Sequence, residues 1–286
     1  MHTGFYVSSY TEPRCLRAGA AHQEADGREY HPVKKFFLFI TICILFVSCK
    51  KQEEFGTVEL RFSHTVDEHP IQFNQLIYTN KAGNLYQVNE VKYFISRLFL
   101  IDNEGKSIEI KQDQGIHYVD CSLEKTMQWV IKEVPHKNYT AISFVYGLDE
   151  NDNQSNRFVN PPESNFAWPD VLGGGYHYMQ INGKFKNKNG ELQNMNIHTG
   201  IGQLRDENNE VIQFVHNYFT VKLPLTFTVE KNNTKHITLN MEIQRWFDMP
   251  NLYNFDDFGT GIMQNQHAQQ LLKENGQNVF EVVISD

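Results

Sequence analysis

The chain has 286 residues, of which 40% are hydrophobic and 13% aromatic, so it has enough apolar material for one large domain or two small ones and is not wholly disordered. The net charge is −8 and no basic stripe is present, which argues against nucleic acid as a partner. The 4 cysteines provide neither a disulfide framework nor a CxxC metal knuckle.

A bacterial lipoprotein leader is predicted near the N-terminus. Two lysines precede an apolar run over residues 36–47, which is too short to span a bilayer comfortably and is typical of a signal-peptide core. The run ends in Phe46-Val47-Ser48-Cys49, which resembles a lipobox with Cys49 as the lipidated residue. We therefore predict a lipoprotein signal peptide over 33–49, with a short transmembrane anchor as the alternative.

The leader determines how the rest of the chain is divided. Residues 1–32 are polar and precede the charged flank, so we interpret them as a non-native upstream extension, with translation beginning at Val33 through an alternative start codon. Residues 50–56 form a charged tether, and 57–286 are predicted to form one domain. A lipid on Cys49 would anchor that domain to the outer membrane, on its periplasmic side or at the cell surface.

The segments after the tether show the two-residue alternation of β-strands. In residues 57–66, Val58, Leu60, Phe62 and His64 share one face, which places His64 at an inward-pointing position. Further strands are predicted over 91–101, 107–111, 115–121, 139–147, 211–215, 218–229, 236–243 and 279–284, and helices over 122–132 and 261–275. The pattern predicts an all-β fold, an antiparallel β-sandwich with short helical additions, one of them near the C-terminus.

The stretch 166–185 combines an aromatic corner, three consecutive glycines and an alternating strand. Gly173–Gly175 allow backbone angles that other residues avoid, and they allow another segment to approach closely. The alternation that follows predicts His177 and Met179 on one face of one strand, and both are soft-metal ligands. The alternative is that they are ordinary interior side chains of a sandwich.

Several short stretches occur in an order and spacing that resemble one family. They are Phe62-Ser63-His64, Tyr78-Thr79-Asn80, Tyr93-Phe94-Ile95-Ser96, His117-Tyr118-Val119-Asp120, Gly175-Tyr176, Ile197-His198-Thr199-Gly200 and Ile262-Met263. Together they resemble the MbnP-like domain, a periplasmic copper-binding protein associated with methanobactin operons, over residues 57–284. The resemblance implies a secreted β-sandwich that binds copper and that has a di-haem cytochrome of the peroxidase type as a partner.

The resemblance also implies the metal ligands. In copper-binding members of the family, histidines hold the metal beside an oxidised tryptophan (kynurenine), and the matching histidines here are His64 and His117. The tryptophan expected a few residues after the first histidine is absent, and His69 is the only candidate donor in that stretch.

Four histidines lie among apolar neighbours in strand-like segments, and they are His64, His117, His177 and His198. Either each is a core residue with its own hydrogen-bond partner, or some of them share a metal. Copper is preferred over zinc because Met179 and Met263 are available and no HExxH motif is present. We predict one copper ion bound through His64 and His117, with His198 or His177 as the next donor.

The sequence has no GxSxG elbow, no P-loop and no dinucleotide fingerprint, so a non-enzymatic role is predicted. The alternative function is a surface-exposed module that binds glycans or proteins through an aromatic platform. The platform would consist of Trp168, Tyr176, Tyr178, Trp246, Phe247, Tyr253 and Phe255. Converging histidines would favour the metal, whereas a flat exposed aromatic strip would favour the binding module.

Overall fold

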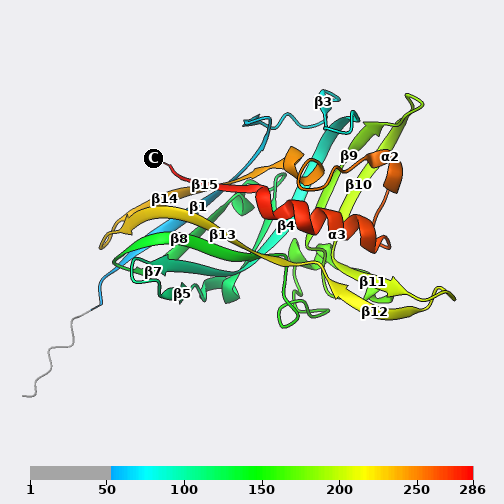
Figure 1. Ribbon diagram of the computed structural model, residues 1–286. Coiled ribbons are helices and arrows are strands. Elements are labelled where there is room, and N and C mark those ends of the chain that lie inside the picture. Colours follow the sequence, from blue (N-terminus) through cyan, green and yellow to red (C-terminus); the bar gives the residue numbers. More distant parts are fainter. Residues whose placement is uncertain (1–52, 286) are drawn as a thin grey trace, which may run out of the picture. The chain divides into compact units, whose positions relative to one another are not determined.

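The computed structural model describes residues 53–285, and their strands form two large β-sheets and one two-stranded sheet (Figure 1). The predicted extension 1–32, the leader with Cys49 and residues 50–52 of the tether lie outside the described residues. Within 53–285, none of the helices is both long and apolar enough to cross a bilayer.

The first sheet has 5 strands, and β1 and β14 are its parallel pair. Its strands are β1 (Phe55–Val66), β2 (His69–Pro70), β7 (Gln128–Pro135), β14 (Thr234–Glu242) and β15 (Phe280–Ile284). Every second residue of β1 is buried, as the alternation of its side chains predicts. Val58, Leu60, Phe62 and His64 therefore face the interior, and each large apolar side chain buried there contributes about 1.5–3 kcal/mol.

The second sheet has 8 strands. They are β3 (Tyr78–Thr79), β4 (Leu85–Asp102), β5 (Ser107–Glu109), β6 (Ile116–Asp120), β8 (Lys137–Tyr146), β9 (Met179–Lys186), β10 (Leu192–Thr199) and β13 (Phe219–Val229). Tyr93 of β4 is fully buried and meets Phe62 of the first sheet edge to face, with ring centroids 6.5 Å apart. The two sheets thus enclose an aromatic core, and the predicted all-β sandwich is confirmed.

The remaining elements are short. A two-stranded sheet of β11 (Ile201–Arg205) and β12 (Val211–His216) projects at the lower right of Figure 1. The helices are α2 (Phe255–Phe258) and α3 (Gln266–Asn275), and 3₁₀ turns span Gln112–Gly115, Glu124–Thr126, Glu163–Phe166, Asp170–Leu172, Ile243–Phe247 and Gly276–Asn278. The C-terminal helix was predicted to begin at residue 261, but it begins at Gln266, where the Asn265 side chain caps it.

A long irregular segment, residues 147–178, covers the outer face of the second sheet. Phe158 stacks on Phe94 of β4 with ring centroids 5.3 Å apart, and Phe166 packs on Tyr118 of β6 at 5.2 Å. An antiparallel bridge between Ala167 and Tyr176 closes the segment on itself. The outer face around β4 and β6 is therefore an aromatic layer of its own and is not a solvated surface.

Two local predictions were wrong. The segment 122–132 is not a helix, because Trp129 and Ile131 alternate and both are buried as part of β7, which pairs with β1. His177 and Met179 do not share a face. The strand begins only at Met179, whose side chain is buried, and the His177 ring contacts His198, which pairs with the neighbouring Gln180.

The three glycines behave as the sequence predicts, since all of them have positive φ. We expect Gly174→Ala to destabilise the fold by about 2–3 kcal/mol, because φ is unfavourable for a residue with a Cβ and that Cβ would lie 2.6 Å from Ser155 Oγ. Gly190→Ala is the matched control, because its φ of +80° is similar but nothing lies within 4 Å, so it should cost only ~1 kcal/mol. Equal losses in chemical denaturation would contradict a steric role for Gly174.

Candidate metal centre

His64 lies near the end of β1 and points between the two sheets. Its ring meets Tyr93 edge to face at 5.7 Å, and its Nε2 atom is buried with no hydrogen-bond partner among the described residues. Burial lowers the pKa of His64 from 6.5 to about 4, so the ring is neutral at physiological pH. A buried nitrogen in this state is unusual, because buried polar atoms nearly always have a partner.

His117 approaches the same inter-sheet space from the second sheet. Its ring lies parallel between Phe62 and Trp129, with centroid distances of 5.0 and 5.1 Å. Nε2 lies 2.8 Å from the carbonyl oxygen of Thr126. A carbonyl only accepts, so Nε2 carries the proton and Nδ1 has the lone pair. Burial lowers the pKa of His117 as well, against the opposing effect of the Thr126 carbonyl.

His64 and His117 both lie on the interior side of their sheets, and their rings contact different aromatic side chains, Tyr93 and the Phe62/Trp129 pair. Phe62 precedes His64 by two residues on β1 and stacks on His117. A surface groove of about 490 Å³ reaches His117 and is lined by residues that include Lys125, Thr126 and Phe158. Solvent thus reaches the site from the side of His117, while His64 lies deeper.

His177 and His198 form a second pair on the other face of the second sheet. Their ring centroids are 5.2 Å apart and the planes are inclined by 78°. Ile197 and Thr199, the neighbours of His198 on β10, are buried on the interior side, so the sheet separates this pair from His64. Burial lowers the pKa of both rings to about 4.

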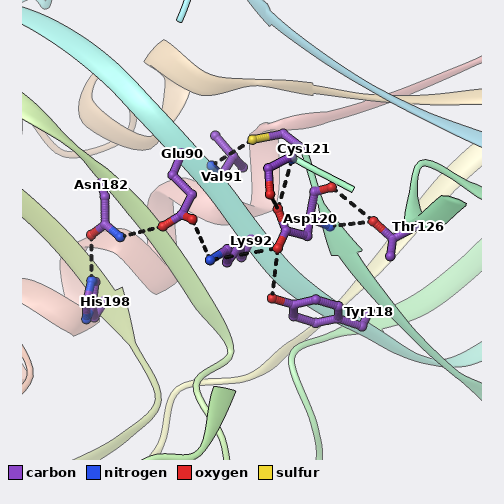
Figure 2. A network of polar contacts seen from close by, with 10 residues as sticks. Glu90, Val91, Lys92, Tyr118, Asp120, Cys121, Thr126, Asn182 and His198 are labelled. Carbon is purple, nitrogen blue, oxygen red and sulfur yellow. Dashed lines mark hydrogen bonds and ion pairs between the residues drawn. The ribbon is translucent and has the colours of Figure 1, made fainter. Parts of the chain in front are cut away.

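Hydrogen bonds and ion pairs connect the outer pair to the strand of His117 (Figure 2). They run from His198 through Asn182 and Glu90 to Lys92, which also lies 3.7 Å from Asp120. The backbone N–H of Asp120 in turn donates to the hydroxyl of Thr126, and the backbone carbonyl oxygen of Thr126 accepts the proton of His117.

The structure thus arranges the four predicted histidines as two pairs and not as one site. Neither His177 nor His198 faces His64, because they lie on the opposite side of the second sheet. Within residues 53–285 no three His, Cys, Asp or Glu side chains lie close enough together to hold one metal ion. His69 is exposed, and its ring nitrogen Nδ1 bonds the Asp67 backbone carbonyl.

The sequence alone did not indicate two residues of these sites. Trp129 stacks on His117, yet it was placed in a predicted helix; the buried alternation of Trp129 with Ile131 was the signal for a strand. Asn182 accepts a hydrogen bond from His198. Its only signal in the sequence is the spacing of two residues from Gln180, which puts both side chains on the sheet face that carries His198.

The predicted aromatic platform is wrong. Its residues are buried to 2% exposure or less, and they are Trp168, Tyr176, Tyr178, Trp246, Phe247, Tyr253 and Phe255. Their role is packing, because they contact one another and the neighbouring strands, as Trp246 does with Tyr146 at 5.2 Å.

The fold and its histidines define a class of protein, a β-sandwich with buried neutral imidazoles between and outside its sheets. The family model MbnP matches residues 55–265, and the chain belongs to the MbnP family. A solved structure, MbnP from Methylosinus trichosporium, has the same fold, with a TM-score of 0.55 and 15% sequence identity over 82% of this chain and 100% of that chain. No curated protein matches the sequence.

The depressed pKa of His64 predicts how the stability of the metal-free protein depends on pH. The pKa is 6.5 in the unfolded chain and about 4 in the fold, so the unfolded state binds more protons between these values. Stability should be fully present above pH 6.5 and fall as the pH drops towards 4, by on the order of 3 kcal/mol from this residue.

The measurement is urea denaturation at several pH values with a chelator present. His64→Leu should show a smaller loss of stability on acidification than the wild type. His136→Leu is the control, because the His136 side chain is 43% exposed. If His64→Leu and the wild type lose stability equally over this interval, the buried neutral state of His64 is refuted.

Proposed function

We propose that this protein is a non-enzymatic copper-binding lipoprotein of the cell envelope whose copper is held by histidines. The observation that carries the proposal is His64 Nε2, a buried nitrogen of a neutral ring with no partner among residues 53–285. An unsatisfied buried polar atom costs about 1–3 kcal/mol, and a bound cation would offset that cost. Membership of the MbnP family supports the same assignment, because copper binding is the property that the family resemblance implies.

The interior donors fit copper better than they fit zinc or calcium. His64 and His117 are neutral imidazoles, which suit copper and zinc, whereas calcium requires several oxygen ligands. Structural zinc requires four ligands, and no third His, Cys, Asp or Glu joins the pair within the described part of the chain. Of copper, zinc and calcium, copper as Cu(I) requires the fewest ligands.

His64 and His117 would hold this ion from the two sheets. The hydrogen bond from His117 Nε2 to Thr126 fixes the ring and leaves Nδ1 as the donor atom, as outer-shell partners do in metal sites. The groove beside Lys125 and Phe158 provides the route by which copper enters. Copper is the cargo of the protein in this proposal, and no reaction is assigned to the chain.

The partner class and location follow from the family resemblance and from the leader. The partner is a di-haem cytochrome of the peroxidase type, and the lipid on Cys49 holds the domain at the outer membrane. The alternative of an aromatic binding module is not favoured, because its platform is part of the core.

We expect the double change His64→Ala and His117→Ala to abolish binding of the interior copper. Both donors are removed, while the sandwich retains its other aromatic contacts, such as Tyr146 with Phe219 at 4.8 Å. Competition with a chromogenic Cu(I) chelator measures the stoichiometry, and circular dichroism checks the fold.

The matched control is the double change of His136 and His236 to alanine. Both are histidines outside the two pairs and contact the surface carboxylates of Glu54 and Glu59. Full copper retention by the His64/His117 variant would exclude the interior site.

Lipidation gives a separate prediction. Cys49→Ser in the full chain, expressed in a bacterium, should move the protein from the membrane fraction to the soluble fraction, because the thiol that accepts the lipid is gone. Western blotting of the fractions measures the change, with Cys43→Ser as the control within the same leader. A Cys49→Ser protein that stays with the membranes would contradict the anchor.

A further inference from the structure

The neighbour of His64 on the adjacent strand is a methionine. β1 and β14 run parallel in register, and their interior side chains form the pairs Phe62 with Leu239 and His64 with Met241. The first pair is apolar on both strands, whereas the second brings an imidazole beside a thioether. Both groups are ligands of copper in proteins. The sequence did not indicate Met241 as a donor, because β1 and β14 are far apart along the chain.

The contacts on either side of this pair show that register partners on β1 and β14 touch. Ser63 donates a hydrogen bond of 2.9 Å to the side chain of Asn240, and Thr65 donates one of 2.7 Å to the carboxylate of Glu242. Met241 lies between these contacts and is fully buried. Since adjacent strands are about 4.8 Å apart, the Met241 side chain lies beside His64 on the interior face.

Two buried polar atoms near this pair have no partner within residues 53–285. They are His64 Nε2 and the hydroxyl oxygen of Tyr93. The Tyr93 ring meets the rings of His64 at 5.7 Å and of Phe280 at 6.2 Å, and Phe280 is the partner of Met241 on β15. His64, Tyr93, Phe280 and Met241 therefore form one group of contacts at this end of the core, and the group contains the unsatisfied nitrogen.

The spacing of the two donors fits one soft ion. A metal bound at about 2.0 Å from nitrogen and about 2.3 Å from sulfur holds these atoms up to ~4.3 Å apart, close to the distance between adjacent strands. A methionine side chain has three rotatable bonds and adapts to such a separation. Both donors are neutral and the surroundings are apolar, so a monovalent cation costs less to bury here than a divalent one.

We propose that the thioether of Met241 is a ligand of the copper that His64 holds, and that it makes the interior site selective for Cu(I). The inference rests on the proposed function, because it adds a donor to the same site. No third His, Cys, Asp or Glu joins the interior histidines within residues 53–285. A methionine lies outside that set of residue types, and thioether ligands favour Cu(I) over harder ions such as Zn(II).

The test is a titration of the purified full-length chain with Ag(I), a redox-inert substitute for Cu(I). The chain is labelled with ¹³C at the methionine methyl groups and with ¹⁵N in the imidazoles. The methyl signal of Met241, assigned through the backbone resonances, should shift together with His64 Nε2 and saturate at one equivalent. This measurement requires no variant, so it does not depend on how a mutant folds.

Met195 provides the internal control. It is buried like Met241, but it lies on β10 and pairs with Gly183, which in turn pairs with Val88 of β4. Val88 is roughly 17 Å along β4 from Tyr93. The methyl signal of Met195 should therefore stay unchanged during the titration.

A matched pair of variants measures the contribution to affinity. Leucine conserves the volume of methionine, so Met241→Leu and Met195→Leu should both retain the fold. Met241→Leu should weaken Cu(I) binding at least about tenfold in competition with a chromogenic chelator under anaerobic conditions, which is the lower end of the loss when even an outer-shell partner is removed. Its affinity for Zn(II) should change less, and Met195→Leu should bind both ions as the wild type does.

The readouts separate failure of this inference from failure of the proposed function. If Ag(I) shifts His64 Nε2 but leaves the Met241 methyl signal unchanged, and Met241→Leu binds Cu(I) as tightly as the wild type, Met241 is a packing residue and the inference is overturned. The proposed copper site at His64 would then stand. If His64 Nε2 does not respond to saturating Ag(I), the interior site itself is refuted, and the role of Met241 with it.

Discussion

Strand β4 is the constraint on which the rest of the structure depends. It runs over 18 residues and pairs with β3, β5, β6, β8 and β9. Because successive side chains of a strand point to opposite faces, Tyr93 faces the interior and meets His64, while Lys92 faces outward and meets Glu90 and Asp120. This strand therefore separates two chemically distinct spaces, and each of them contains one pair of histidines.

Burial is the first cause of the protonation state in both spaces. It lowers the pKa of His64, His177 and His198 to about 4, and it lowers that of His117. Charging any of these rings would require desolvating a cation among aromatic side chains. The fold thus keeps all four as neutral imidazoles, the form in which histidine binds metals.

The alternation of side chains within one segment predicted features that depend on a single strand. It could not predict contacts that depend on which strands are neighbours in the sheet. The inward position of His64 followed from the period of β1 and is confirmed by its burial. That His117 would face Phe62, and that His198 would meet His177, depends on β6 lying beside β4 and β10 beside β9. No local pattern contains that information. The predicted face of His177 was wrong because the chain becomes regular only at Met179.

The aromatic residues were misassigned for a related reason. A tryptophan or tyrosine in an all-β sequence has the same local pattern whether it covers a sheet or forms a surface platform. Trp168 and Tyr176 are buried because residues 147–178 fold back over the second sheet, and that return is fixed by the bridge between Ala167 and Tyr176. The corner that was predicted as a candidate platform is instead the cover that encloses His177.

The polar network on the outer face orients the histidines without charging them. A carboxylate in direct contact with an imidazole would favour the protonated ring and raise its pKa. Here the amide of Asn182 lies between Glu90 and His198, so it fixes the direction of the hydrogen bond while the negative charge stays one residue away, beside Lys92. At the other end, His117 also contacts a neutral group, the backbone carbonyl of Thr126, while the Asp120 carboxylate is held by Ser122 and Lys92. Because a neutral group contacts the ring at both ends, the network can contain three charged side chains and still leave a lone pair on each histidine.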